Sequence, residues 1–260
     1  MSKGKQGRDR GGPEAWLVLD GAYAGGMPLI VLWDIDHTLI ENSGVSKEIY
    51  ARAYALLTGK WPEHAAATEG RTDRLIMRGL FNQHALTEPP WPQIEAALTQ
   101  AGQERADALR ARGNALPGVR TILKTASAQE SWVSSVLTGN IQANARVKLA
   151  AFDLDGLVDL SVGAYGADAE QRPALVDVAR TRVRHRYGLP TETPVVLVGD
   201  TPRDVEAAEV AGAHAIAVAT GVHSQAELAR VGAAVVLPDL SDTTALIGLL
   251  EGFVSRQKAH

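Results

Sequence analysis

The sequence predicts an α/β fold in which a doubly wound parallel sheet forms the core and a small helical cap is inserted after the first strand. Short segments rich in Val, Leu and Ile alternate with helical patterns along most of the chain. Such apolar runs are typical of strands buried on both faces, and their alternation with helices indicates parallel βαβ units. Residues 43–115, which lie between two predicted strands, are helical throughout and too long for one crossover helix.

Six apolar segments are predicted to form the strands of the sheet. A helical pattern follows each of the last five, as a βαβ order requires. The predicted strands are residues 28–34, 132–139, 157–166, 194–200, 213–221 and 233–240. On this basis, the α/β core comprises residues 27–42 and 116–260, and the cap comprises residues 43–115.

The beginning of the chain has a different composition. Residues 1–26 start with a basic, Gly-rich stretch, and no apolar segment typical of a signal peptide follows it. We expect residues 1–26 to be disordered. Met27 directly precedes the first strand, so the preceding residues are interpreted either as an extension or as a misplaced start. No apolar run reaches the ~20 residues that a membrane helix needs, so no membrane segment is expected.

The charge balance and the residue types exclude several classes of function. The 30 acidic residues outnumber the 26 basic ones, and a net charge of −4 is unfavourable for binding nucleic acid. The aromatic residues are few and do not alternate with basic ones, as a single-strand binder requires. Because the chain has no cysteine, disulfides, zinc–thiolate sites and cysteine nucleophiles are excluded. A reducing cytoplasm is the expected compartment.

Acidic residues and a threonine stand at the ends of three predicted strands. Asp34 and Asp36 end the first strand, Thr138 ends the second, and Asp200 ends the fourth, with Asp204 four residues later. Ligands of open parallel sheets bind at the carboxyl ends of the strands. Residues two apart on an extended chain face the same side, so both carboxylates of the first strand can reach one site. An Asp before a helix is often only an N-cap, which is the alternative for Asp36 and Asp204.

These side chains are suited to bind a metal ion and a phosphate group together. Clustered carboxylates repel one another unless a cation neutralises them, and Mg²⁺ is a hard cation that prefers oxygen ligands and also binds substrate phosphate. A Thr hydroxyl, the amides near Gly139 and Asn140 and a basic side chain suit phosphate oxygens. An Asp carboxylate can attack phosphorus. The pattern therefore predicts phosphoryl transfer through an aspartyl-phosphate.

Three segments resemble the motifs of the haloacid dehalogenase-like (HAD) hydrolase superfamily. They are "DIDHTL" at residues 34–39, "LTGN" at 137–140 and "VGDTPRDVEAA" at 198–208, and each is placed at the end of a predicted strand. Their order and spacing match, and the helical insertion lies where that family carries its C1-type cap. The resemblance spans residues 28–254 and is greatest to the phosphoglycolate phosphatase-like members.

The resemblance implies a role for each matching residue. Asp34 is expected to be the nucleophile and a Mg²⁺ ligand. Asp36 is expected to protonate the leaving oxygen and then to activate water, while its backbone carbonyl binds Mg²⁺. True dehalogenases of the family lack an acid/base carboxylate at this second position, so Asp36 favours phosphate chemistry over carbon–halogen cleavage. Asp200 is expected to bind Mg²⁺, and Asp204 to bind it directly or through water.

The phosphoryl group is expected to be held by Thr138 and by the amides near Gly139 and Asn140. The basic residue that the family places before the helix after the third strand is usually Lys, and Arg172 occupies this position here. Arg keeps the charge and binds phosphate in a fork rather than as a point. Lys148 is the alternative for this role and is otherwise interpreted as a solvated surface charge.

Two further residues are candidates for contact with the substrate. His37 stands where the family usually has Gly or an aromatic residue, and either lines the pocket or is a packed or solvated spacer. Arg71, in the cap segment, either reaches the substrate or is a surface residue. Caps of this family supply specificity, so the resemblance gives Arg71 a possible substrate-binding role.

The sequence thus predicts a Mg²⁺-dependent phosphatase that hydrolyses a small phosphate monoester through an aspartyl-phosphate. Its expected partner is a small phosphorylated metabolite, with neither nucleic acid nor membrane involved, and the oligomeric state is left open. One alternative is a phosphomutase of the same superfamily. The other is a non-catalytic regulatory protein that binds a phosphate ligand. The substrate itself is left open among phosphoglycolate, nucleoside monophosphates and sugar phosphates.

Overall fold

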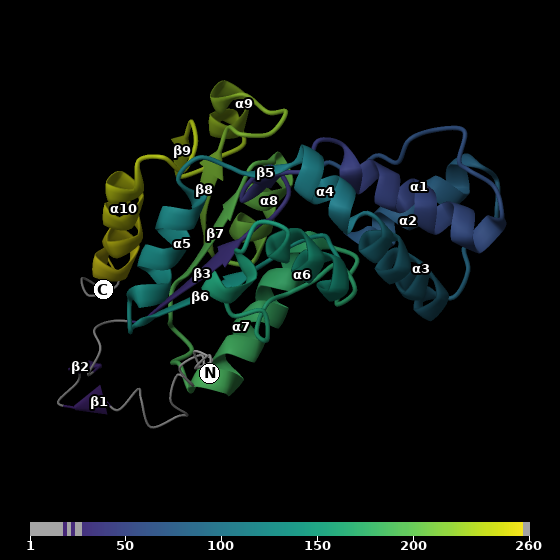
Figure 1. Cartoon of the computed structure of the whole chain (residues 1–260). Helices are drawn as coiled ribbons and strands as arrows, with labels where there is room; N and C mark the ends of the chain where they lie inside the picture. The colour runs from purple at the N-terminus through teal and green to yellow at the C-terminus, as the bar shows by residue number, and fades with distance from the viewer. Residues whose placement is uncertain (1–17, 20–21, 24–27, 257–260) are drawn as a thin grey trace, which may run out of the picture.

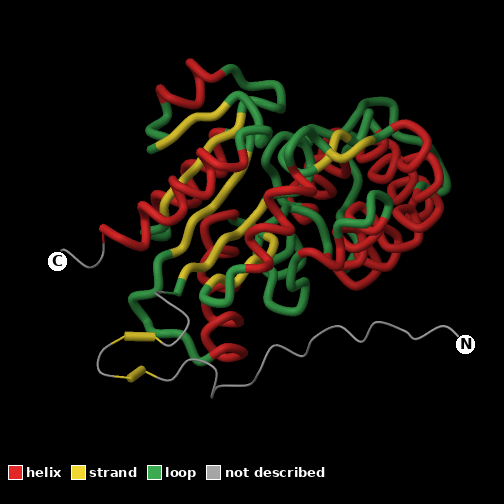
Figure 2. The backbone as a smooth tube through the Cα atoms, turned by 60° about the vertical axis from the view of Figure 1, so that its left-hand side comes forward, coloured by secondary structure: helices red, strands yellow, loops and turns green. Residues whose placement is uncertain are grey.

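A five-stranded parallel sheet forms the centre of the molecule (Figures 1 and 2). The computed structural model describes residues 18–19, 22–23 and 28–256. The strand order is β6-β3-β7-β8-β9, and every neighbouring pair is parallel. The strands are β3 (Leu29–Trp33), β6 (Trp132–Val136), β7 (Val195–Gly199), β8 (His214–Val218) and β9 (Val235–Leu237). Five of the six predicted strands are therefore confirmed.

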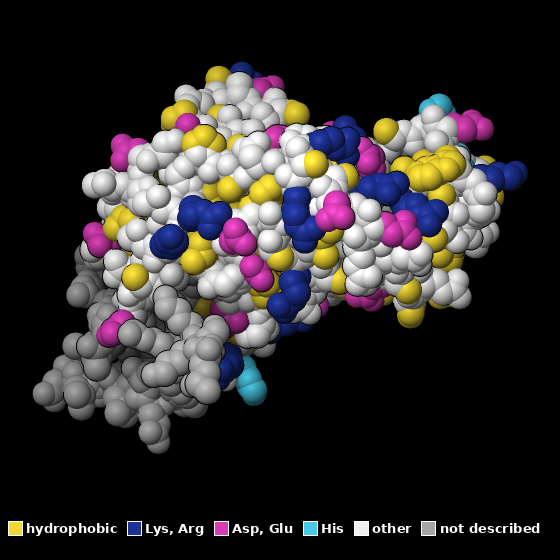
Figure 3. Space-filling view, viewed as in Figure 1, with side chains coloured by type: hydrophobic (Ala, Val, Ile, Leu, Met, Phe, Trp, Pro, Cys, Tyr) yellow, Lys and Arg dark blue, Asp and Glu magenta, His cyan; other side chains and the backbone are white. Residues whose placement is uncertain are grey.

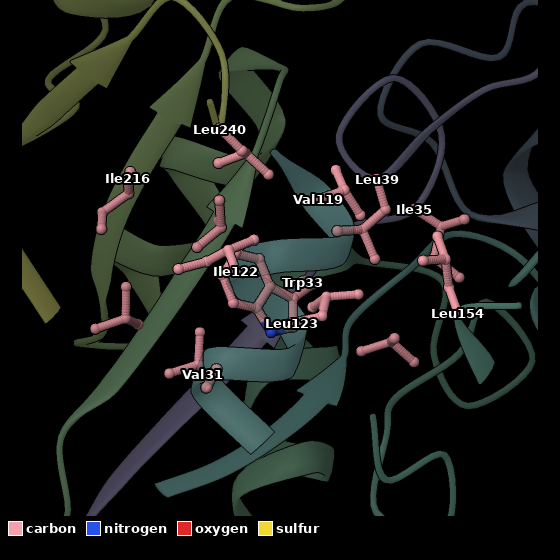
Figure 4. Close-up of a cluster of buried hydrophobic side chains, with 14 of the residues drawn as sticks. Val31, Trp33, Ile35, Leu39, Val119, Ile122, Leu123, Leu154, Ile216 and Leu240 are labelled. Atoms are coloured by element: carbon pink, nitrogen blue, oxygen red, sulfur yellow. The ribbon is translucent and has the colours of Figure 1, made fainter. Parts of the chain in front are cut away.

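Helices cover both faces of the sheet, which confirms the doubly wound α/β class. The alternation of side chains along β3 shows how one strand serves two cores. Val31 and Trp33 face a cluster that includes α5 (Val119–Ala128) and α10 (Thr243–Arg256), and Figure 4 shows part of this cluster. Ile30, from the same strand, belongs to the opposite cluster. The helices on that side are α7 (Arg172–Tyr187), α8 (Pro202–Val210) and α9 (Gln225–Arg230).

The predicted strand over residues 157–166 is wrong. The chain there forms a short 3₁₀ turn, η2 (Asp155–Leu157), followed by further turns, and only Ala164 makes a β-bridge, to Leu137. Asp159 explains the difference, because its carboxylate accepts hydrogen bonds from the amide and the hydroxyl of Ser161. Such local bonds from an Asp side chain stabilise a turn in place of a strand.

The segment predicted as a cap consists of four helices with a core of their own. Figure 1 shows α1, α2 and α3 to one side of the sheet, with α4 nearer to it. The helices are α1 (Val45–Thr58), α2 (Asp73–Gln83), α3 (Trp91–Glu104) and α4 (Ala106–Arg112). The chain enters this segment through β4 (Ile40–Glu41) and leaves it through β5 (Asn114–Ala115), and these two strands pair antiparallel. The entry to the cap and the exit from it therefore lie side by side.

Helix α6 (Gln142–Ala150) connects the core with the cap. Its residues Ala145 and Leu149 belong to the hydrophobic core beside the sheet, whereas Ile141, directly before it, belongs to the core of the cap. Because only the short loop of residues 137–141 separates β6 from α6, this contact brings the cap close to the strand ends where the site is predicted.

The predicted extension over residues 1–26 lies outside the described residues except at two short strands. These are β1 (Val18–Leu19) and β2 (Ala22–Tyr23), which pair antiparallel with each other. Among the described helices, none combines the length and the apolar character that a membrane span requires. In Figure 3, basic and acidic side chains are interspersed over the described part of the visible face, so positive charge is not gathered into one stripe there.

Candidate active site

The carboxyl ends of three neighbouring strands meet at one cavity of about 240 Å³. The strands β6, β3 and β7 are adjacent in the sheet, so the residues that follow them are brought together although they are far apart in the sequence. Almost all the predicted site residues line this cavity: Asp34, Asp36, His37, Arg71, Thr138, Gly139, Asn140, Arg172 and Asp200. Asp204 lies behind this lining and contacts it through Arg172.

Three buried aspartates form a group that is suited to hold a cation. Asp34, Asp200 and Asp204 each offer a carboxylate oxygen, and these oxygens lie within 4.8 Å of one another. Burial, the largest cause, together with the charges of Asp204 and Asp36, raises the pKa of Asp34 to about 6, although Arg172 opposes the shift. Burial and the charges of Asp204 and Asp34 also raise the pKa of Asp200. A divalent cation with a preference for oxygen ligands would relieve this repulsion, so the residues fit Mg²⁺.

Two glycines allow the backbone to approach these carboxylates. A Cβ atom on Gly221 would lie 1.9 Å from Oδ2 of Asp200, and one on Gly199 would lie 2.6 Å from Oδ2 of Asp204. Any larger residue at either position would therefore displace a carboxylate of the acidic group. Gly221 is a site residue that the sequence did not reveal, and its position after the end of β8 was its only signal.

Arg172 lies between the nucleophile candidate and Asp204, as predicted for the basic residue of the site. Its Nε donates to Oδ1 of Asp204 at 2.8 Å, and its Nη2 lies 3.0 Å from Oδ1 of Asp34 and 2.5 Å from Oδ1 of Asp204. Burial lowers the pKa of Arg172, but the two carboxylates outweigh it and raise the pKa. Nη2 is buried and makes no directed hydrogen bond within the described part of the chain. This amino group is therefore suited to donate to a phosphate oxygen.

Asp204 makes the capping contacts of one alternative that the sequence left open, and it also lies in the acidic group that the other alternative, contact with Mg²⁺, requires. Its Oδ2 accepts from the amide and the hydroxyl of Thr201, in a capping box at the start of α8. Its Oδ1 contacts Arg172, and the carboxylate also belongs to the acidic group. Both oxygens therefore already have protein partners, and the contact of Asp204 with Mg²⁺, direct or through water, stays a prediction.

Asp36 also lines the cavity, but its carboxylate is not part of the acidic group. Lys148, on α6, contacts it through Nζ at 2.6 Å to Oδ2 and 2.8 Å to Oδ1. Asn42, Ser46 and Asn140 also donate to it, at 2.8, 3.0 and 2.8 Å. Burial would raise the pKa of Asp36, but the charge and hydrogen bonds of Lys148 and the bond from Asn140 outweigh it and lower the pKa to about 2. Contact of its backbone carbonyl with a metal stays a prediction.

Lys148 was interpreted as the alternative to Arg172 or as a surface charge, and the surface interpretation is wrong. Its side chain is only 2% exposed. Sequence reasoning missed its contact with Asp36, although one signal was present. Asn140 lies in the loop directly before α6, and Lys148 lies on α6 about two turns from its start, so the helix can carry its side chain back towards this loop.

Thr138 and the two residues after it form a compact loop at the end of β6. Asn140 donates through Nδ2 to Oγ1 of Thr138 at 2.7 Å, and the amide of Asn140 lies 3.3 Å from the same oxygen. A Cβ on Gly139 would lie 2.0 Å from the backbone oxygen of Arg71, so glycine is required where the cap segment crosses this loop. The loop thus lies between the cap and the sheet, which fits its predicted role in holding the phosphoryl group.

A buried carboxylate from the cap fastens the cap to this loop. Asp73, at the start of α2, accepts from the hydroxyl of Tyr50 at 2.7 Å and from the amide of Ile141 at 2.8 Å. Its own amide donates to the backbone oxygen of Gly139 at 2.7 Å. Burial raises the pKa of Asp73 to about 6, although the bonds from Tyr50 and Ile141 oppose the shift. The sequence alone did not indicate this link, because it depends on the start of α2 lying against the start of α6 in the fold.

His37 and Arg71 both line the cavity, and their roles as substrate contacts stay predictions. His37 has a positive φ of 60° and its ring lies 3.0 Å from the carboxylate of Glu41. A positive φ is a backbone conformation that glycine adopts more readily than other residues. Arg71 is half-buried, and no described residue bonds its guanidinium, which leaves it free to contact a ligand.

A comparison with known families decides to which group of proteins this site belongs. The family model of the haloacid dehalogenase-like hydrolases matches residues 31–209, which is more than half of the chain. The chain belongs to the haloacid dehalogenase-like hydrolase family. This membership confirms the predicted family and the prediction that the protein is a hydrolase. Among functionally curated proteins, none matches the sequence closely enough to count as similar.

Several solved structures share the fold. A hydrolase from Pseudomonas syringae is 21% identical, with a TM-score of 0.61, over 85% of this chain and 98% of that one. A protein from Haemophilus somnus 129pt, named as a predicted phosphoglycolate phosphatase, is 19% identical, with a TM-score of 0.60, over 85% and 98%. A protein from Bacteroides vulgatus assigned as a β-phosphoglucomutase is 19% identical, with a TM-score of 0.61, over 88% and 91%. At these identities, the likeness shows a common fold.

Proposed function

We propose that this protein is a Mg²⁺-dependent phosphatase that hydrolyses a small phosphate monoester through an aspartyl-phosphate. One observation carries the proposal: two aspartates that are two residues apart line one cavity in different surroundings. Asp34 lies in the acidic group beside Arg172, whereas Asp36 lies outside it beside Lys148. Neighbouring carboxyl groups with distinct environments are typical of sites in which one attacks and the other transfers a proton.

Asp34 is the nucleophile in this proposal. Its amide donates to the backbone oxygen of Val198 at 2.9 Å, and its Oδ1 lies 3.0 Å from Nη2 of Arg172, so both its backbone and its carboxylate are held in place. Bound Mg²⁺, held by Asp34 and Asp200 with Asp204 behind them, would neutralise the carboxylates and the charge of the phosphate. Arg172, Thr138 and the amides near Gly139 and Asn140 would hold the phosphoryl oxygens.

Asp36 transfers protons in this proposal. It protonates the leaving oxygen during attack by Asp34, and then accepts a proton from the water that hydrolyses the aspartyl-phosphate. The structure supports the second role directly, because Lys148 and the neighbouring donors keep the carboxylate ionised. The small cavity, lined from the cap side by Arg71, supports a small phosphorylated metabolite as the substrate. The absence of cysteine supports a cytoplasmic location.

The proposal is tested by phosphate release from a panel of small phosphate esters, in Mg²⁺ and in EDTA, for the wild type and for Asp34→Asn. We expect turnover to require the metal and to fall by more than about 1,000-fold in Asp34→Asn, because the nucleophile is removed. Asp107→Asn is the matched control, since Asp107 lies on the cap surface and its side chain is 97% exposed. Full activity of folded Asp34→Asn would refute the mechanism.

The same panel separates the proposed phosphatase from the predicted phosphomutase alternative. A phosphatase releases inorganic phosphate from a monophosphate alone. A mutase would require a bisphosphate activator and would move the phosphoryl group between hydroxyls of a sugar. Metal-dependent binding of esters without any turnover would instead favour the regulatory protein.

A further inference from the structure

Lys148 is a buried cation to which the proposed mechanism gives no role beyond keeping the carboxylate of Asp36 ionised. Its Nζ has four contacts, to both oxygens of Asp36, to Oγ of Ser46 at 2.8 Å and to Oδ1 of Asn140 at 2.6 Å. Only 2% of its side chain is exposed, so the ammonium group makes these contacts in place of contacts with water. A buried charge is costly unless it is paired and hydrogen-bonded, so this arrangement fixes all four groups relative to one another.

The partners of Lys148 come from three separate parts of the molecule. Asp36 follows β3, Asn140 belongs to the loop that crosses beneath the cap, and Ser46 lies in the first turn of the cap helix α1. Ser46 in turn donates to Oδ1 of Asp36 at 3.0 Å, and Asn140 donates to Oδ2 at 2.8 Å. Lys148 is therefore at the centre of a network that connects the carboxylate of Asp36 to the cap and to the loop of residues 138–140.

We propose that Lys148 is a positioning residue that orients the carboxylate of Asp36 for the hydrolysis of the aspartyl-phosphate and couples this orientation to the cap through Ser46. This inference rests on the proposed phosphatase function. Lys148 does not contact the acidic group. Arg172 is the residue that pairs with Asp34 and Asp204 of that group. Arg172 and Lys148 therefore have different positions in the site, with Arg172 beside the nucleophile and Lys148 beside the proton-transferring carboxylate.

This division predicts a defect that is confined to one chemical step. With p-nitrophenyl phosphate, the leaving group departs without needing a proton, so formation of the aspartyl-phosphate does not depend on Asp36. Hydrolysis of the aspartyl-phosphate still needs Asp36 to accept a proton from water, with that oxygen bonding to phosphorus and the Asp34 acyl–phosphate bond breaking. Loss of Lys148 should therefore slow the second step and leave the first unchanged.

The test is rapid-mixing kinetics of p-nitrophenyl phosphate with the Mg²⁺-loaded wild type and with Lys148→Ala. For Lys148→Ala we expect a burst of about one equivalent of p-nitrophenolate, formed as fast as in the wild type. We expect the following steady-state rate to be lower by about 100-fold, the scale of a lost general base. Methylammonium in the buffer should restore much of this rate, because it can enter the space left by the side chain, whereas tetramethylammonium should not.

Further variants keep the inference testable if Lys148→Ala fails to fold. Lys148→Met retains the apolar stem and should show the same burst and the same slow steady state. Ser46→Ala removes one partner and should slow the steady state less, by about 10-fold, with the burst intact. Lys124→Ala is the matched control, since Lys124 is exposed on α5 and should behave as the wild type.

The outcomes separate this inference from the proposed function. Absence of any metal-dependent p-nitrophenolate release by the wild type would refute the phosphatase proposal itself. With an active wild type, a wild-type steady-state rate in folded Lys148→Ala or Lys148→Met would overturn the role of Lys148. A burst slowed as much as the steady state would also overturn it, because Lys148 would then support the site as a whole.

Discussion

Asp34 and Asp36 are close in the sequence, but their carboxylates differ in what they contact. Asp34 lies with Asp200 and Asp204, and burial together with the charge of Asp204 raises its pKa to about 6. Asp36 lies beside Lys148, and its pKa is lowered to about 2. The sequence predicted that both carboxylates can reach one site, and both residues line the same cavity, but the sequence did not predict their different surroundings. The difference arises from residues on helices α6 and α7, which are distant in the chain.

The glycine beside Asp200 offers a test at the scale of a single residue. We expect Gly221→Ala to weaken Mg²⁺ binding and to lower activity by roughly 10-fold or more, because its Cβ would lie 1.9 Å from Oδ2 of Asp200 and push a metal ligand aside. Calorimetric titration with Mg²⁺ measures the first effect. Gly248→Ala is the control, since a Cβ there meets nothing within 4 Å and alanine favours the helix. Unchanged Mg²⁺ affinity in Gly221→Ala would contradict the proposed metal group.

At the scale of secondary-structure elements, the cap and the core are joined by hydrogen bonds as well as by packing. Helix α2 begins at Asp73, whose carboxylate accepts from Tyr50 on α1 and from the amide before α6. One buried carboxylate therefore connects two cap helices to the start of a core helix. Helix α6 also carries Lys148 and follows the loop of residues 138–140. A displacement of α2 would therefore change the positions of these site residues.

Tyr50 and Tyr54 provide a matched pair for testing this link, since they lie one turn apart on α1 and both are buried. Tyr50→Phe should lower the free energy of unfolding by about 1–3 kcal/mol, because it leaves an oxygen of buried Asp73 without its partner. Tyr54→Phe should change it much less, since no described hydrogen bond involves the Tyr54 hydroxyl. Urea denaturation measures both. An equal loss of unfolding free energy in the two variants would show that the hydrogen bond from Tyr50 to Asp73 does not stabilise the fold.

At the scale of the whole molecule, the acidic group makes stability depend on pH and on Mg²⁺ together. In the metal-free fold, the pKa of Asp34 is about 6 and that of Asp200 is also raised, above the ordinary value of 3.8. Between the ordinary pKa of 3.8 and the raised pKa of about 6, the folded protein binds more protons than the unfolded chain. The free energy of unfolding therefore falls as the pH rises through about 6. Asp36 has the opposite effect on stability, because its pKa is lowered to about 2, and this effect occurs at lower pH. The stability that Asp36 contributes is lost only as the pH falls from about 4 towards 2.

Mg²⁺ should therefore stabilise the fold more at higher pH, because it binds ionised carboxylates and only the folded state assembles them. We expect the rise in Tm between EDTA and excess Mg²⁺ to be larger at about pH 7.5 than at about pH 5. Thermal unfolding of the full chain in both buffers measures it. Asp200→Asn should lose most of the Mg²⁺ effect at either pH. The same Mg²⁺ effect at both pH values in the wild type would contradict this account.

Much of this protein could be predicted from its sequence, because local patterns carry the information. Val- and Leu-rich runs placed five of the six strands, since a strand buried on both faces must be apolar throughout. Acidic residues at the ends of those runs predicted the site, because parallel strands end at one edge of a sheet. The length of the helical segment between the first two strands predicted a separate group of helices.

The tertiary structure decided the features that depend on distant contacts. The segment at 157–166 is apolar enough for a strand, but the bonds of Asp159 to Ser161 fold it into turns. Lys148 could be read as a surface charge until the packing of α6 buried it beside Asp36. Asp73 could be placed at a helix start, but only the fold sets it against the amide of Ile141. Sequence patterns determine which elements form, whereas the burial and pairing of a charged side chain depend on the elements packed around it.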